Sequence, residues 1–490
     1  MRGRALPPED NDRPIMSESV VQKQTGLQGL STAILLPSVS LFGEPAGLYT
    51  DDVGPLTCVV GIGLFQRAVL TLQRAGIRQL MVLVGPEESQ LRQALAKGPR
   101  VTIPVRWMPI REFPLDDPRT WEALAAEVRG FCLLSGVQAV FASPLIENLR
   151  QSVQEGQAIV VARADSGRDR QPRRSNLRVK VQSGRLLSIT SRQDDTALVV
   201  TDLVVLPASF MSVVGQASGE VGTVPIRRWL ERAAVDGHVR VLSTETNRSH
   251  WYQDVHDAAD VKAAEKKLFN SLKGEFEGFV DRFFNRKVSR WFTRIFLVAG
   301  FSPNAITIVA SLIGLAAAAG FGVGTYSAGI IAALLFQLAA IIDCCDGEVA
   351  RLTFTESPFG AWLDIAMDNV VHMAIFAGIA VGSYLHLAGS DGAWVSLALG
   401  AAAVLGNGLS FWLVTRAQKI KAASGWKTPV QAAWSDFMLK NVASRDFSVV
   451  VLIFAVLGKL DWFLWMAAIG SVVFSILMLW VIRPSATSRA

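Results

Sequence analysis

The sequence predicts two structural classes in one chain: an α/β domain, followed by an all-α membrane domain of about six helices. The first half alternates short apolar segments with amphipathic stretches, which is typical of strands alternating with helices. The second half includes Ile295–Ile342, which contains no charged residue and is long enough for two spans of about 20 residues each. These two observations divide the chain into a soluble part and a membrane part.

We expect four segments along the chain. Residues 1–27 are polar and rich in Pro, Asp and Gln, which indicates a disordered lead-in without a signal peptide. Residues 28–260 form the α/β domain, and residues 261–298 form a linker with an interfacial helix. Residues 299–490 form the membrane domain.

The α/β domain has helical periodicity at Gly63–Ala75, which is ended by Gly76, and at Trp121–Arg129. Residues 165–176 are polar and arginine-rich, so we expect an exposed loop there. Strands alternating with helices favour a doubly wound, Rossmann-type sheet. The expected strands, in chain order, are Ser31–Leu36, Gln79–Val84, Phe131–Leu134, Val137–Phe141, the hairpin Leu177–Val181 with Leu186–Thr190, and Ala197–Leu206.

Two further helices lead toward the membrane domain. Ala258–Leu272 is a charged helix. In Gly278–Phe296, aromatic and branched apolar residues are interleaved with Arg and Lys. That composition favours an amphipathic helix lying on the cytoplasmic leaflet. An ordinary surface helix of the soluble domain is the alternative.

Lys and Arg lie before the first expected span and after the second, fourth and sixth, whereas the intervening loops have few. By the positive-inside rule, both termini are expected in the cytoplasm. The chain is therefore expected to be an integral membrane protein, of the inner membrane if it is bacterial. The expected spans are 304–322, 327–345, 359–383, 393–415, 446–458 and 462–482.

Two basic clusters, Arg282–Arg294 and Arg416–Lys427, contribute much of the net charge of +6. They either set the membrane topology or attract anionic lipid or a phosphorylated substrate, and the two interpretations are compatible. The four cysteines show no metal-ligand spacing. Because the soluble part is expected to face the cytosol, we do not expect a disulfide framework.

Four aspartates and an arginine lie inside or beside the second and third expected spans. Charges at this depth are costly, and they usually serve a function. Their spacing places them on two helical faces, because residues three, four, seven and eight apart share one side of a helix. The first face carries Asp343, Asp346, Gly347, Ala350 and Arg351, and the second carries Gly360, Asp364 and Asp368.

Four carboxylates with a single arginine repel one another in a low dielectric, and divalent cations relieve that repulsion. Ligands that are all oxygen favour Mg²⁺ or Mn²⁺ over Zn²⁺. Two such ions can clamp a diphosphate while a remaining carboxylate deprotonates a hydroxyl. A salt-bridged helix pair and a cation-transport pathway are the alternatives that these residues leave open.

The pattern D-x2-D-G-x2-A-R-x8-G-x3-D-x3-D resembles the signature of the CDP-alcohol phosphotransferase family at every position. The resemblance covers roughly 278–482, and it includes the segment Pro303–Thr307 at the start of the first span. It implies that two divalent ions are held by Asp343, Asp346, Asp364 and Asp368. It also implies that the CDP moiety is bound by Gly347, Ala350, Arg351, Gly360, Asn304 and Thr307.

The same resemblance implies the reaction. Asp368 would be the general base that activates an acceptor hydroxyl. The hydroxyl would attack the alcohol-linked phosphate of a CDP-alcohol, with release of CMP. The expected function is therefore an integral membrane CDP-alcohol phosphotransferase of phospholipid biosynthesis, and homodimers are expected from the family.

Basic residues on the predicted cytoplasmic side are candidates for acceptor binding, because some family members bind a phosphorylated polyol in this way. Anchoring by the positive-inside rule is the alternative for each of them. The donor would be CDP-diacylglycerol or a CDP-polyol, and the acceptor a polyol, a polyol phosphate or a lipid alcohol. Membrane lipids are expected partners, and nucleic acid is not. The candidates are Arg416, Lys419, Lys440 and Arg445.

In the first domain, Pro55–Val84 and Trp251–Val255 resemble parts of sugar-phosphate nucleotidyltransferases. The order of the two domains resembles bifunctional inositol-phosphate cytidylyltransferase/phosphotransferase proteins. Leu36–Ser40, however, lacks the glycines whose amides would cradle phosphate. Ser135 and Gly136 stand where an acidic metal ligand is expected after Phe131–Leu134, so Asp254 lacks its partner. We expect a degenerate scaffold or regulatory domain, and the alternative is a second activity that makes a CDP-polyol from CTP.

Overall fold

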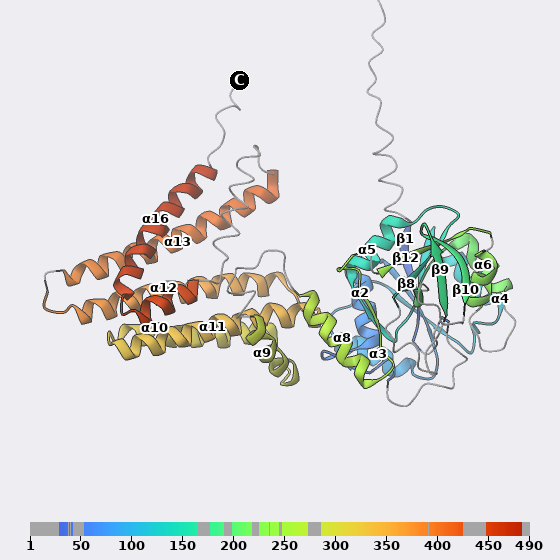
Figure 1. The fold of residues 1–490 in the computed structure, drawn as a ribbon, viewed down its shortest axis with the longest axis horizontal. Helices are drawn as coiled ribbons and strands as arrows, with labels where there is room; N and C mark the ends of the chain where they lie inside the picture. Colours follow the sequence, from blue (N-terminus) through green and yellow to red (C-terminus); the bar gives the residue numbers. More distant parts are fainter. Residues whose placement is uncertain are drawn as a thin grey trace, which may run out of the picture. The chain divides into compact units, whose positions relative to one another are not determined.

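The chain divides into two compact units, Met1–Leu268 and Phe269–Ala490, each described here by itself (Figure 1). The division falls inside helix α8 (Ala258–Ser271), slightly later than the boundary expected at residue 260. The computed structural model describes residues 29–37, 39, 41–42, 53–164, 177–190, 198–217, 225–234, 236–244, 247–272, 286–390, 392–424 and 447–482.

The first unit is built on a nine-stranded mixed sheet in the order β5-β4-β1-β6-β11-β8-β12-β10-β9. The first four strands in this order are parallel, as a doubly wound sheet requires. Strand β11 then pairs antiparallel with both β6 and β8, an arrangement that was not expected from the sequence. The strands are β1 (Leu30–Leu36), β4 (Gln79–Val84), β5 (Val105–Pro109), β6 (Phe131–Gly136), β8 (Ala158–Arg163), β9 (Arg178–Gln182), β10 (Arg185–Thr190), β11 (Leu198–Pro207) and β12 (Val239–Ser243).

Helices cover both faces of this sheet, so each face has its own apolar core (Figure 1). Phe65 and Leu145 belong to one core, and Trp121 and Trp229 belong to the other. Burial on both sides explains why the central strands are almost continuously apolar. The first face is covered by α2 (Leu64–Arg74), α3 (Glu88–Lys97) and α5 (Ser143–Ser152), and the second by α4 (Pro118–Glu127), α6 (Ala208–Gln216) and α7 (Ile226–Ala233).

Most of the expected strands and both expected helices are confirmed, including the antiparallel β9–β10 hairpin. The expected strand Val137–Phe141 forms only as β7 (Ala139–Phe141), which pairs with β13 (Tyr252–Asp254) outside the main sheet. A second small pair joins β2 (Cys58–Val59) to β3 (Ile62–Gly63). The polar loop expected at 165–176 lies outside the described residues.

The second unit is helical, and five of its described helices are long and apolar enough to cross a membrane: α10, α11, α12, α13 and α16. Helix α15 is apolar, but it has only 10 residues in the described part of the chain. The sixth span therefore stays a prediction. The helices are α9 (Arg286–Val298), α10 (Pro303–Gly322), α11 (Tyr326–Thr353), α12 (Pro358–His386), α13 (Ala393–Ser424), α15 (Phe447–Val456) and α16 (Leu460–Ile482).

Glycines bring α12 into backbone contact with α10. A Cβ at Gly378 would overlap the carbonyl oxygen of Ala318, and one at Gly382 would overlap that of Phe321. The two glycines stand four residues apart, so they form one smooth strip along α12. The first turn of α12 lies beside α10 as well, because a Cβ at Gly360 would lie 3.0 Å from the side-chain oxygen of Asn304.

Candidate metal centre

Three of the four motif aspartates converge. Asp343 and Asp346 come from α11, and Asp364 comes from α12. One carboxylate oxygen from each residue lies within 4.8 Å of the others. The side chains of Asp343 and Asp346 are buried, with 8% and 6% exposure, and Asp364 is half-buried. The spacing of the motif therefore brings carboxylates from two helices to one point.

The ends of the two motif helices are fixed by local sequence. Helix α11 ends at Phe354, whose φ of 57° is left-handed and whose backbone N–H donates to the carbonyl of Ala350. The next helix begins after Ser357, whose hydroxyl accepts a hydrogen bond of 3.0 Å from the backbone N–H of Gly360. Pro358 stands at the first helical position, where its missing N–H does no harm. The connection between the two halves of the motif is thus short and defined.

Helix α10 contributes two polar residues to the same region. The hydroxyl of Thr307 donates a 2.5 Å hydrogen bond to Oδ2 of Asp346, and Thr307 is 3% exposed. The amide oxygen of Asn304 lies 3.0 Å from the position that a Cβ on Gly360 would take. Of the residues expected to bind CDP, Thr307 therefore lies next to the carboxylate of Asp346, and Asn304 lies next to Gly360.

Arg351 is exposed, and its guanidinium folds back over the preceding turn of α11. Its Nη1 lies 3.3 Å from the position of a Cβ on Gly347, so any side chain there would meet the arginine. Ala350 is half-buried. The arginine thus lies over Gly347, the residue that directly follows Asp346.

Asp368 is half-buried one turn beyond Asp364 on α12, and it is not part of the group within 4.8 Å. His372, one turn further along, makes edge contacts with Phe336 at 6.0 Å and Phe447 at 5.1 Å between ring centroids. These contacts support a packing role for the histidine. The role of Asp368 as ligand and base stays a prediction.

Of the four expected acceptor residues, the structure describes the side chain of Arg416 alone, so their grouping stays a prediction. Arg416 lies on α13, exposed, with its guanidinium carbon 5.2 Å from the centre of the Trp412 ring. The side chain of Lys419, and Lys440 and Arg445 as a whole, lie outside the described residues.

One polar residue of the motif helix was not expected from the sequence to have a role. Glu348 is 2% exposed, and its carboxylate accepts hydrogen bonds from the hydroxyls of Ser289 and Thr293 on α9. The sequence does contain the residue types of this contact. Glu348 is a further acid inside the motif, and the two hydroxyls stand four residues apart on an amphipathic helix.

The donor set fits a hard divalent cation. Its ligand atoms are carboxylate oxygens, and they lie close together in a mostly buried setting. Mg²⁺ and Mn²⁺ prefer such oxygen ligands. Asp343, Asp346 and Asp364 are therefore the residues that would hold a metal ion.

In the first unit, the carboxylate of Asp254 is occupied by an arginine. Arg163 donates to it from Nε at 2.9 Å and from Nη2 at 2.5 Å. Ser135 is fully buried, and a Cβ on Gly136 would lie 2.7 Å from Oδ2 of Asp202. An acidic side chain at position 136 would therefore collide with Asp202. Part of Leu36–Ser40, namely Ser38 and Ser40, lies outside the described residues.

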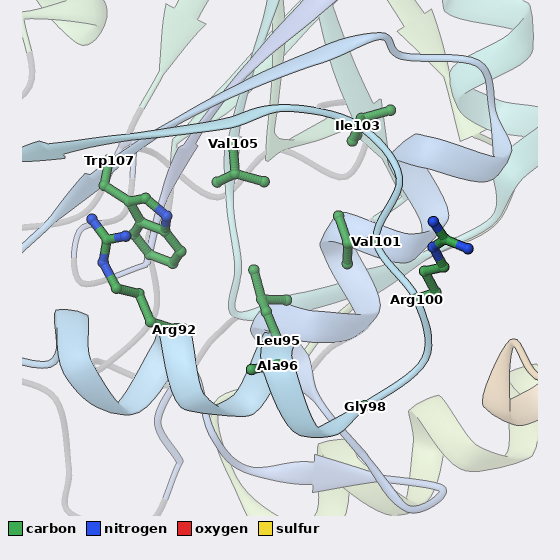
Figure 2. A pocket seen from close by; sticks show the side chains of 9 residues that line it. All are labelled: Arg92, Leu95, Ala96, Gly98, Arg100, Val101, Ile103, Val105 and Trp107. Carbon is green, nitrogen blue, oxygen red and sulfur yellow. The ribbon is translucent and has the colours of Figure 1, made fainter.

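A pocket of about 530 Å³ lies beside α3 and β5 (Figure 2). Figure 2 shows the guanidinium of Arg92 beside the ring of Trp107, and its carbon is 4.6 Å from the ring centre. Arg92 also pairs with Glu88 at 2.6 Å. None of the predicted site residues lines this pocket.

The second unit is thus a helical membrane domain with a carboxylate cluster contributed by α11 and α12, a site class suited to divalent metal ions. Residues 301–483 match the family model described as CDP-alcohol phosphatidyltransferase, and this part of the chain is a domain of that family.

Several curated proteins are similar to the chain. The "Bifunctional IPC transferase and DIPP synthase" of Aquifex aeolicus is 32% identical over 207 residues, which cover 42% of this chain and 45% of that protein. The protein of the same name from Rubrobacter xylanophilus is 26% identical over 381 residues, which cover 76% of this chain and 81% of that protein. The "Archaetidylinositol phosphate synthase" of Pyrococcus horikoshii is 36% identical over 83 residues, or 17% of this chain and 43% of that protein.

The match to the Aquifex protein spans less than half of that protein's length. Among solved structures, the inositol-1-phosphate CTP transferase from T. maritima is similar at a TM-score of 0.39 and 16% identity. That match covers 50% of this chain and 99% of the other.

Proposed function

We propose that the protein is an integral membrane CDP-alcohol phosphotransferase of phospholipid biosynthesis. It transfers a substituted phosphate from a CDP-alcohol to an acceptor hydroxyl and releases CMP. The convergence of Asp343, Asp346 and Asp364 within 4.8 Å carries the proposal. It occurs inside the region that matches the CDP-alcohol phosphatidyltransferase model.

In this proposal, Asp343, Asp346, Asp364 and Asp368 hold two Mg²⁺ or Mn²⁺ ions. Such ions, when bound, neutralise the donor diphosphate and stabilise the leaving CMP. The buried position of Asp343 and Asp346 supports the assignment, because buried carboxylates this close together need positive charge.

Asp368 accepts the proton of the acceptor hydroxyl. The hydroxyl oxygen then forms a bond to the alcohol-linked phosphorus, and the bond from that phosphorus to the CMP oxygen breaks. Arg351 neutralises phosphate charge above Gly347, and Thr307 orients the carboxylate of Asp346. Asn304, Gly360 and Ala350 line the CDP moiety in this proposal.

The donor is CDP-diacylglycerol or a CDP-polyol, and inositol phosphate is the first acceptor to test. This choice rests on the names of similar proteins, which include "Archaetidylinositol phosphate synthase". We place both termini in the cytoplasm, with six spans and a homodimer. Exposed apolar side chains such as Leu312, Ile331 and Leu405 support contact with membrane lipids.

The test is CMP release by the purified protein in liposomes, from a panel of CDP-alcohols with Mg²⁺ or Mn²⁺. Asp368→Asn is expected to abolish release. Asp461→Asn, an exposed acid at the start of α16 and outside the motif, is the matched control and should retain it. Metal flux into the liposomes without CMP release would favour a cation transporter instead.

We further propose that the first domain is catalytically silent. The Arg163–Asp254 ion pair supports this, because the arginine occupies the carboxylate that a metal ion would need. The alternative is a bifunctional enzyme. The alignment with the Rubrobacter protein, which is named bifunctional and matches 76% of this chain, favours that alternative.

The two possibilities differ in whether CTP is converted to CDP-polyol and diphosphate. The full chain carrying Asp368→Asn, which blocks consumption, is incubated with CTP, Mg²⁺ and inositol phosphate. A silent domain yields neither CDP-polyol nor diphosphate. Formation of both, lost again on adding Asp254→Asn, would establish the bifunctional enzyme.

A further inference from the structure

We infer that Glu348, Ser289 and Thr293 form a polar clamp that holds helix α9 against α11 and thereby aims the motif carboxylates. Glu348 is in this sense a positioning residue, because its carboxylate accepts hydrogen bonds from α9 and is not among the three carboxylates that converge. The effect on catalysis rests on the proposed function, whereas the clamp itself does not.

The clamp is a complete buried network. The Ser289 hydroxyl donates to Oε1 of Glu348 at 3.1 Å, and the Thr293 hydroxyl donates to Oε2 at 2.7 Å. Both hydroxyl residues are fully buried, and Glu348 is 2% exposed. The Cys345 thiol also donates to the Ser289 carbonyl at 3.5 Å. Each carboxylate oxygen thus has its own donor, which a buried polar group requires.

The position of Glu348 within the motif connects the clamp to the orientation of Asp346. Glu348 follows Asp346 by two residues, so the two side chains point about 200° apart around α11. One side of the helix therefore carries the metal-ligand carboxylate, and the other side is bound to α9. Rotation of α11 would break the clamp and turn Asp346 away from Asp364. Buried polar networks commonly fix such a unique arrangement where apolar packing allows several.

Helix α9 has a second apolar face. Phe292 and Phe296 pack inward against the α10–α11 core. Trp291, Ile295 and Val298 stand on the opposite side, with exposures of 61%, 43% and 91%. A helix with a docked face and an exposed apolar stripe suits the membrane interface. The clamp therefore links a helix at the lipid boundary to the helix that carries the catalytic motif.

The experiment compares three variants of the full chain in liposomes. Glu348→Leu leaves two buried hydroxyls without an acceptor. It is expected to lower CMP release by about 10- to 100-fold, with a higher KM for Mn²⁺ and faster amide exchange across α9. Glu348→Gln keeps an acceptor oxygen, and it should restore most of the lost activity. If Glu348→Leu does not fold, CMP release and amide exchange are compared between the wild type and Glu348→Gln.

The third variant, Glu348→Leu with Ser289→Ala and Thr293→Val, replaces the whole clamp by apolar groups. Because no polar group is then left unsatisfied, slow exchange of α9 and most of the CMP release should return. If slow exchange returns but CMP release does not, Glu348 acts in the chemistry and the inference is wrong. Unchanged exchange and CMP release in Glu348→Leu would overturn it equally. If the wild-type protein releases no CMP, the proposed function fails, while the exchange data still decide the clamp.

Discussion

Replacing Thr307 by Val tests how much the motif depends on its neighbouring helix. The substitution keeps the shape of the buried side chain but removes the hydroxyl that donates to Asp346 at 2.5 Å. A hydrogen bond to a charged group contributes about 1.5–3 kcal/mol, which corresponds to roughly a ten- to hundred-fold effect. The usual loss on removing a group that orients a metal ligand, about 10- to 100-fold in affinity or activity, agrees with this range.

The assay is CMP release as a function of Mn²⁺ concentration, together with direct Mn²⁺ binding by electron paramagnetic resonance. Ser311→Ala is the matched control, because its buried hydroxyl on the same helix donates only to the Thr307 backbone carbonyl at 2.8 Å. We expect Thr307→Val to weaken Mn²⁺ binding and Ser311→Ala to leave it nearly unchanged. Equal Mn²⁺ affinity in the wild type and Thr307→Val would refute the idea that this hydroxyl orients Asp346.

Gly382→Ala should lower the midpoint of thermal unfolding, since its Cβ overlaps a carbonyl of α10 and overpacking destabilises by about 1–3 kcal/mol. Gly470→Ala, whose Cβ meets nothing within 4 Å, should not, and equal midpoints would contradict the packing of α10 on α12. Gly360→Ala should raise the KM for the CDP-alcohol without unfolding the protein, because its Cβ would lie 3.0 Å from an amide oxygen of α10. Of the four thiols, only the exposed Cys58 should react with a thiol reagent at mildly alkaline pH. Burial raises the pKa of Cys132 to about 12, so the unreactive thiol form persists until far higher pH. A second reactive thiol in the native protein would contradict this burial.

Much of the membrane domain is predictable because its signals are local. The start of α10 at Pro303 agrees with the expected span 304–322. Helix α11, in contrast, continues to Thr353, beyond the expected span 327–345, as the helical spacing of the motif through Arg351 indicates. The convergence of Asp343 with Asp364 follows from helical spacing and a short connection. These features need no knowledge of which helix packs on which.

Features that depend on pairing between distant segments were not predictable. The acid at position 348 and the two hydroxyls of α9 are visible in the sequence, but their pairing is not, because the rotation of one helix on another depends on the whole packing. Strand β11 reads as an apolar strand, yet its antiparallel insertion between β6 and β8 is a property of the sheet. The capture of Asp254 by Arg163, 91 residues earlier, is likewise invisible in sequence order.

The two units carry opposite polar arrangements. Around Asp343 and Asp364, carboxylates gather as a divalent ion would require. Around Asp254, an arginine already supplies positive charge at 2.5 Å. This contrast supports assigning the phosphotransferase chemistry to the membrane domain and a scaffold or regulatory role to the first domain.

The most direct measurement is the stoichiometry of transfer by the purified protein in liposomes with Mg²⁺ or Mn²⁺. We predict one CMP released for each phosphodiester formed between donor and acceptor, and no turnover in Asp343→Asn or after removal of divalent ions by a chelator. Turnover that persists in Asp343→Asn, or continues with the chelator present, would contradict a reaction at the carboxylate cluster of α11 and α12.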